Sequence, residues 1–278
     1  MNKKFGITAA AVLMALSLSA CSSNGSQSSS SSTSQSSQVS KKNSNSSAKT
    51  NQTNKSNNSS ASSSSKPSSQ APEENRMAKM TAKLREALPG MLLPTTDGLG
   101  QGSDKLNVRY TKNGNTNVVY YSVGDSSADF NADSVKNEKP FAILTEIKNA
   151  SSSEVEDTIN YTPEQSGLPT TKLDSNTTAT IQGAAGQRYL QWNANNYSFV
   201  IQASSQLKKD PTDRGKSVLQ LSKQYSLPKT SDKGSVRVIV GDSVGSLNTT
   251  IAWQDGNNVY QLKAHDTETA FKMLNSLK

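Results

Sequence analysis

Two stretches, 190-LQWNANNYSFVIQA-203 and 251-IAWQDGNNVYQLKA-264, decide the fold class of this chain. Each contains an apolar strand with a Trp, an Asn-rich turn, and a second strand with a Tyr, which is the pattern of a β-hairpin. A helical pattern follows each of them. The repetition predicts two related halves of sheet plus helix, although Trp-turn-Tyr hairpins also recur independently in β-rich proteins.

More strands are expected on both sides of these hairpins. Asn113-Gly114 is a strong turn signal, because both residue types tolerate positive φ, and it separates two strand patterns. A Gly-Ala-Ala-Gly turn at 183–186 separates two others. The expected strands cover 106–111, 117–123, 141–149, 177–182, 188–192 and 236–240.

Three helices are expected among these strands. The first follows Pro72 and places Met77, Met80, Leu84 and Leu88 on one face. The second covers 210–225, and the third starts at Thr267 with Asp266 as its cap. Hairpins with a few helices indicate an α+β fold with an antiparallel, hairpin-rich sheet, not alternating β/α units.

The basic charge of the chain is concentrated before the predicted domain. Of the 30 Lys and Arg residues, seven are lysines in residues 1–72, which contain no acid; residues 73–278 therefore carry 23 bases against all 22 acids. A nearly neutral domain argues against binding to nucleic acid, for which a clustered basic face is expected.

The N-terminus has the parts of an export signal. Lys3 and Lys4 precede an uncharged apolar run from Ile7 to Leu18, which is shorter than the roughly 20 residues that a membrane span needs. Leu18-Ser19-Ala20-Cys21 resembles the lipobox of bacterial lipoproteins. The resemblance implies a signal peptide at 1–20, cleavage before Cys21, and a diacylglyceryl group on its thiol that anchors the protein outside the cell.

Residues 21–72 are predicted to be a disordered tether. They consist almost entirely of Ser, Asn, Gln, Thr and Lys, and such a segment buries too little surface to offset the entropy of ordering. A tether of this kind is similar to those of Gram-positive lipoproteins. The folded extracytoplasmic domain is then expected at 73–278, and because Cys21 is the only cysteine it contains no disulfide and no thiolate site.

A Gly-Asp-Ser motif at 241–243 suggests a serine hydrolase. Followed by Val244-Gly245, it also matches the nucleophile elbow of α/β-hydrolases, with Asp255 and His265, the only histidine, downstream. Against this, a strand instead of a helix is expected after Ser243, and few residues remain to carry the acid and the base. Leu262 occupies the position of the acid in the esterases that share the Gly-Asp-Ser block. A hairpin turn is the preferred interpretation, also for the second Gly-Asp-Ser at 124–126.

No metal or cofactor site is predicted. Asp129, Asn131 and Asp133 have the spacing that starts a calcium loop, but Ser134 replaces the required Gly and Pro140 the bidentate Glu. A solvated loop is therefore preferred over a looser calcium site. His265 has no thiolate with which to bind a metal and is expected at the surface.

Six aromatic residues have two possible roles. Tyr120, Tyr121 and the pairs Trp192/Tyr197 and Trp253/Tyr260 either pack across strands or line a groove for glycan or peptide.

We predict a non-enzymatic binding module at the boundary of membrane and wall. A wall polymer, peptide or envelope protein is its expected partner. The alternatives are an accessory or sensory subunit of a membrane complex, or a serine hydrolase that uses Ser243.

Overall fold

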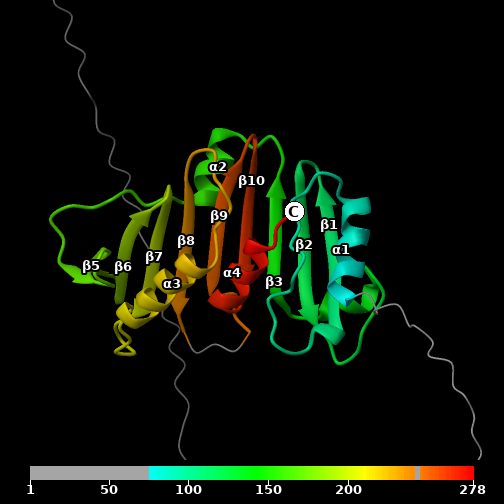
Figure 1. Cartoon of the computed structure of the whole chain (residues 1–278), viewed down its shortest axis with the longest axis horizontal. Helices are drawn as coiled ribbons and strands as arrows, with labels where there is room; N and C mark the ends of the chain where they lie inside the picture. Colours follow the sequence, from blue (N-terminus) through cyan, green and yellow to red (C-terminus); the bar gives the residue numbers. More distant parts are fainter. Residues whose placement is uncertain (1–74, 242–244) are drawn as a thin grey trace, which may run out of the picture. The chain divides into compact units, whose positions relative to one another are not determined.

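The computed structural model describes residues 75–241 and 245–278, and its strands form one ten-stranded sheet (Figure 1). The strand order is β1-β2-β3-β10-β9-β8-β7-β6-β5-β4. The predicted signal peptide, Cys21, the tether and Asp242, Ser243 and Val244 lie outside the described residues. The strands are β1 (Leu106–Asn113), β2 (Thr116–Val123), β3 (Pro140–Ile147), β4 (Thr170–Lys172), β5 (Thr178–Ala184), β6 (Gln187–Ala194), β7 (Tyr197–Ser204), β8 (Gly234–Val240), β9 (Thr249–Asp255) and β10 (Asn258–Ala264).

The described residues form four α-helices and two short 3₁₀ turns. The α-helices are α1 (Arg76–Ala87), α2 (Ser152–Ile159), α3 (Thr212–Gln224) and α4 (Thr267–Asn275); the 3₁₀ turns are η1 (Ser103–Lys105) and η2 (Asp133–Asn137). The α+β class is confirmed, with one more helix than the pattern indicated. The additional helix, α2, begins with a capping box in which Ser151 and Glu154 exchange hydrogen bonds.

One neighbouring pair of strands departs from the predicted antiparallel arrangement. β7 and β8 are parallel, because the chain leaves β7, crosses the sheet through α3, and returns to the next position. All other neighbouring strands in the described sheet are antiparallel. The crossover places β5-β6-β7-α3 beside β8-β9-β10-α4, two units with the same order of elements.

The two Trp hairpins have equivalent geometry. Trp253 lies opposite Tyr260, and their stacked rings have centroids 5.1 Å apart. Trp192 lies opposite Phe199, with ring centroids 4.7 Å apart, so the pairing with Tyr197 was wrong by two residues. The aromatic partner thus follows each Trp at the same sequence distance.

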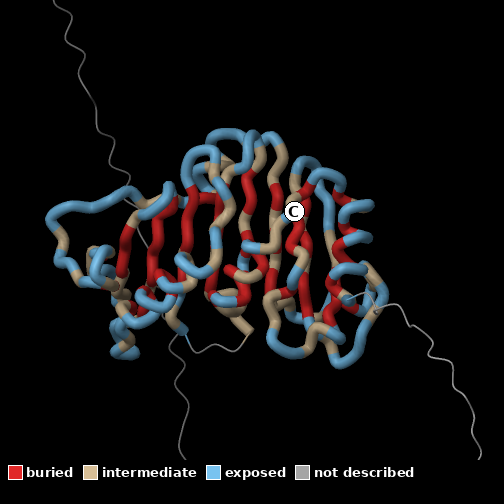
Figure 2. The backbone as a smooth tube through the Cα atoms, viewed as in Figure 1, coloured by how far each residue is buried: buried red, intermediate tan, exposed pale blue. Residues whose placement is uncertain are grey.

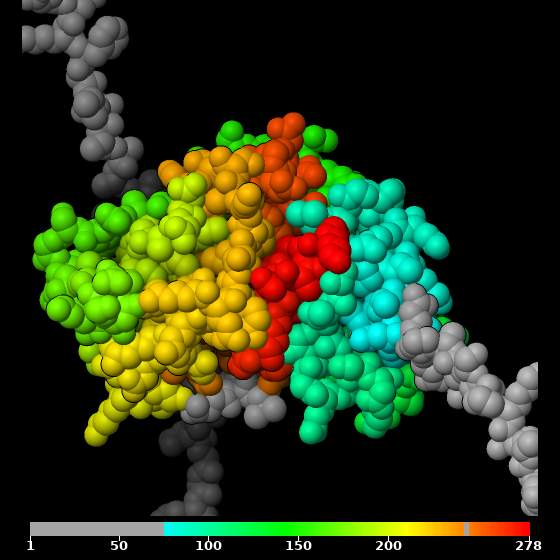
Figure 3. Space-filling model, viewed as in Figure 1, coloured from blue at the N-terminus to red at the C-terminus, as the bar shows by residue number. Residues whose placement is uncertain are grey.

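The helices α1, α3 and α4 cover one face of the sheet and enclose the main core (Figures 1 and 3). The buried segments form a continuous band along the sheet (Figure 2). Met77, Met80 and Leu84 point from α1 into this core, as the helical spacing predicts. The predicted Asp266 cap of α4 is confirmed, since its carboxylate accepts hydrogen bonds from the N–H groups of Glu268 and Thr269.

The remaining helix, α2, packs on the opposite face over β9 and β10. Ile159 forms a second small core there with Ala252 and Val259. Successive residues of each strand point to opposite faces of the sheet and therefore meet different environments. One face carries three helices, and the other carries one two-turn helix.

Asp174 connects the edge of the sheet to α3. Its carboxylate pairs with the Lys223 ammonium, accepts hydrogen bonds from the N–H groups of Asn176 (2.8 Å) and Thr177 (2.6 Å), and has a pKa held below its usual range, chiefly by Lys223. Because the pKa of Asp174 is lower in the folded state, its ionised carboxylate stabilises the fold at pH values above the ordinary Asp pKa of about 3.9. This stabilisation is lost as the pH falls through the pKa that Asp174 has in the folded protein.

Lys223→Met is expected to raise the pKa of Asp174 while leaving it below the ordinary value, because both backbone donors remain. Carboxyl-carbon NMR titration of the variant and the parent measures this change. An unchanged Asp174 pKa would show that the ion pair does not form in solution.

Candidate functional site: the open face of the sheet

The face of the sheet opposite α1, α3 and α4, called here the open face, is only partly covered. α2 lies over one part, and the segment 160–163 continues from it across neighbouring strands. Gln191 donates to the carbonyl of Pro163 at 2.6 Å, Asn193 donates to the carbonyl of Thr162 at 2.9 Å, and Ser198 accepts from the Thr162 N–H at 3.1 Å. The rest of the face carries no helix of the described chain.

A single row of side chains crosses the open face from one edge of the sheet to the other. Strand pairing aligns its members one after another, so that each lies opposite the next on the neighbouring strand. This cross-sheet row consists of Arg109, Tyr120, Ile143, Lys263, Thr250, Arg237, Val200, Gln191, Thr180 and Thr170.

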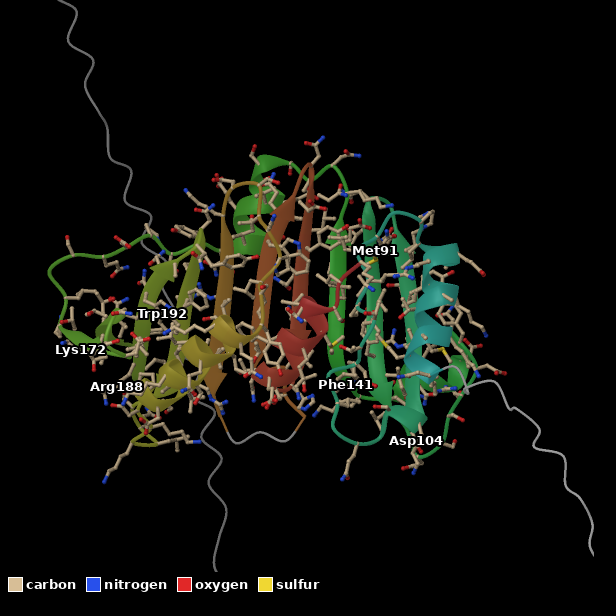
Figure 4. The ribbon with its side chains drawn as sticks, viewed as in Figure 1. Met91, Asp104, Phe141, Lys172, Arg188 and Trp192 are labelled. Carbon is tan, nitrogen blue, oxygen red and sulfur yellow. The ribbon has the colours of Figure 1, made fainter. Side chains whose placement is uncertain are left out.

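The charge on this face is of one sign along the strands. Arg109, Lys263 and Arg237 belong to the cross-sheet row, and Lys172 alternates onto the same face at the sheet edge that Figure 4 labels. The two acids in the described strands, Glu146 and Asp255, alternate onto the helix-covered face. The carboxylates near the open face lie outside its strands: several are on α2, and Glu138 accepts hydrogen bonds from Asn107 on β1 and Ser122 on β2.

A hollow of about 250 Å³ lies at the centre of the row, floored by β7, β8, β9 and β10 and bordered by the end of α2. Arg237 lies in its floor, and Ile239, 51% exposed, lies beside it. Gln202, Thr250 and Lys263 complete the floor, while Asp157 and Asn160 form the rim.

Arg237 is half-buried and has only neutral partners among the described residues. Its Nη1 donates to the carbonyl of Asn160 at 3.0 Å and to the Thr162 hydroxyl at 3.3 Å. Desolvation lowers the pKa of its guanidinium, but an Arg keeps its charge at any physiological pH. The described chain therefore places a cation in the hollow without a carboxylate in ion-pair contact.

Of the six aromatic residues considered for a groove, Tyr120 alone belongs to this face. The Arg109 guanidinium lies 3.5 Å from the centroid of its ring. Of the two alternatives for the others, the structure supports packing within the core under the helices and not a groove: Tyr121, Trp192, Tyr197, Trp253 and Tyr260 are buried. Figure 4 labels Trp192 on β6.

The Gly-Asp-Ser motifs do not assemble a hydrolase site within the described residues. Ser243 lies outside them, but β8 before it and β9 after it are antiparallel neighbours, whereas a nucleophile elbow joins a strand to a helix. The His265 ring is half-buried against Phe141, with Nδ1 3.3 Å from the Phe141 carbonyl oxygen.

The motif at 124–126 has a structural role. A Cβ on Gly124 would lie 2.5 Å from the Glu138 carboxylate and 2.6 Å from the Asn107 amide, so a larger residue would displace these two side chains. The carbonyl of Ser126 accepts a hydrogen bond from that amide at 3.1 Å. Glu138 also accepts from the Ser122 hydroxyl at 2.6 Å, which closes a network around the loop.

The calcium-like spacing at Asp129, Asn131 and Asp133 forms no ligand cluster. Asn131 accepts a hydrogen bond from the Tyr110 N–H at 3.0 Å, and Asp133 pairs with Lys136 at 2.7 Å. Among the residues that the structure describes, no group of three His, Cys, Asp or Glu side chains could hold a metal ion.

No helix in the described part of the chain is long and apolar enough to span a membrane. Comparison of the whole chain with models of protein families, with curated proteins and with solved structures gives no match.

Proposed function

We propose that this protein is a lipid-anchored binding module on the extracytoplasmic face of the membrane, and that it holds its ligand on the open face. The lipobox at Cys21 supports the location. The observation that carries the binding role is the uneven covering of the ten-stranded sheet. Three helices cover one face, whereas α2 covers only part of the other.

The open face is suited to a long ligand that lies across the strands. The row is accessible on one side of the segment 160–163, from Arg109 on β1 to Arg237 on β8, whereas Gln191 is buried beneath that segment. Its hollow is an open depression bordered by α2. A wall polymer, a peptide or a surface of an envelope protein has this extended form.

A neutral blocking variant tests the proposal. Gln202→Trp fills the hollow, whereas Gln220→Trp places the same side chain on exposed α3, on the other face of the sheet. Both would be introduced into the full chain carrying Cys21→Ser, so that no lipid contributes to binding. Retention is measured by co-sedimentation with purified cell walls that keep their polymers and envelope proteins.

We expect Gln202→Trp to lower the retained fraction at least fivefold and Gln220→Trp to leave it within a factor of two. If both variants are retained like the parent chain, the open face is not the binding surface. If the parent chain itself is not retained, binding at the wall is contradicted and docking on a membrane complex becomes the better interpretation.

A further inference from the structure

We infer that the ligand of the open face is a linear polyanion, held along the cross-sheet row by Arg109, Lys263 and Arg237. The inference rests on the proposed binding function and adds the chemical class of the ligand. It starts from three cations aligned in one row and from the absence of strand carboxylates on that face within the described residues.

The spacing of the three cations suits a chain with repeated charges. Neighbouring strands lie about 4.8 Å apart, so Lys263 and Arg237, two strands apart, have Cα atoms separated by about 10 Å. Arg109 is three strands beyond Lys263, at about 14 Å. One extended polymer can meet all three, since its anionic groups follow each other along the same line.

Lys263 and Arg237 both have N–H groups available for a ligand. Lys263 is exposed and has no ion-pair partner among the described residues, and the hydrogen bonds of Arg237 to Asn160 and Thr162 both use Nη1 of its guanidinium. The remaining N–H groups can form charge-assisted hydrogen bonds to phosphate or carboxylate oxygens. Thr250, between them in the row, supplies a hydroxyl donor.

The same geometry disfavours a flat anionic membrane as the ligand. Arg237 lies in a hollow that Asp157 and Asn160 also line, so a flat layer of anionic headgroups would meet a carboxylate beside this cation. Glu154, Glu156 and Asp157 on α2 stand over the same face and would repel an anionic surface, whereas a single chain can pass beside the helix.

Inorganic polyphosphate is the first probe, and polyglutamate shows whether phosphate is required. The full chain with Cys21→Ser is compared with Lys263→Glu, and with the control Lys112→Glu on β1, which makes the same charge change at an exposed position of the helix-covered face. Because the seven lysines of residues 1–72 are identical in both variants, their attraction for the polymer cancels from the comparison.

We expect Lys263→Glu to weaken the Kd for polyphosphate at least fivefold, and Lys112→Glu less than twofold. Arg237→Gln, which keeps an amide donor for the Asn160 carbonyl, should weaken it similarly, with a thermal unfolding midpoint near that of the parent. In both row variants, the slope of log Kd against log salt concentration should decrease by about one, because one fewer counterion is released on binding. Binding of polyglutamate as well as polyphosphate would support a general polyanion site, and binding of polyphosphate alone a site for phosphate.

Equal weakening by Lys263→Glu and Lys112→Glu would overturn the inference, since attraction would then follow net charge and not position. Binding to phosphatidylglycerol vesicles that depends on Lys263, without such binding to polyphosphate, would overturn it in favour of a membrane surface. If Gln202→Trp blocks wall retention while Lys263→Glu leaves the Kd for polyphosphate unchanged, the open face binds another ligand. Only the polyanion is then rejected.

Discussion

A Cys21→Ser chain is expected to carry no lipid and to leave the membrane fraction for the culture medium. In the lipobox proposed at Leu18–Cys21, the Cys21 thiol would receive the diacylglyceryl group, and a hydroxyl does not accept that group. Two acyl chains anchor a protein stably because each buried CH₂ contributes about 0.8 kcal/mol.

Fractionation by immunoblot and metabolic labelling with palmitate measure this outcome. Ser22→Ala is the matched control, because it changes the neighbouring residue while keeping the lipobox Leu18-Ser19-Ala20-Cys21. The control should label and sediment with membranes like the parent, and Cys21→Ser should lose essentially all label. A Cys21→Ser chain that still sediments with membranes in the parental proportion would show that another contact holds it there.

Local patterns in the sequence predicted most of the sheet. The turn between β1 and β2 was recognised from Asn113-Gly114, although its central residues are Gly114 and Asn115, because Asn113 already pairs with Thr116. Gly114 has φ 57°, a left-handed conformation that Gly adopts without steric cost. Short-range signals of this kind depend only on neighbouring residues, so they are readable without the fold.

Features that depend on distant contacts were missed. The parallel pairing of β7 and β8 follows from where α3 returns the chain, and no local residue encodes it. One local feature was also missed: Trp192 was paired with Tyr197 across the turn. Asn195 and Asn196 form a two-residue turn with positive φ at both positions, so Ala194 faces Tyr197 and Phe199 faces Trp192.

The candidate site was likewise visible only in part. Arg109, Arg237 and Lys263 each interrupt an apolar stretch of a strand, between Val108 and Tyr110, Val236 and Val238, and Leu262 and Ala264. That alternation indicates a cation on the face opposite the core. The order of the strands, which brings the three into one row, comes from pairing between segments far apart in the sequence, as does the position of α2 over β9 and β10.

The core contribution of the Trp hairpins is the second large effect. Trp253 is fully buried at the centre of the sheet and stacks on Tyr260, so Trp253→Ala is expected to lower the free energy of unfolding by about 3–5 kcal/mol. Domains of this kind have a total of roughly 5–15 kcal/mol. The variant should therefore unfold at a much lower urea concentration, as measured by tryptophan fluorescence and circular dichroism.

Three matched variants show whether this cost comes from the stacked pair. Trp192→Ala removes the equivalent ring of the β5-β6-β7-α3 unit and should also cost about 3–5 kcal/mol. Trp253→Phe should cost much less, because it keeps an aromatic ring on Tyr260 and removes an indole N–H that has no hydrogen-bond partner in the described structure. Tyr120→Ala, on the half-exposed open face, loses its contact with Arg109 and should cost about 1 kcal/mol or less. If Trp253→Ala destabilised the protein no more than Tyr120→Ala, the Trp253 ring could not lie in the core between the sheet and α4, and the assignment of the open and covered faces would be wrong.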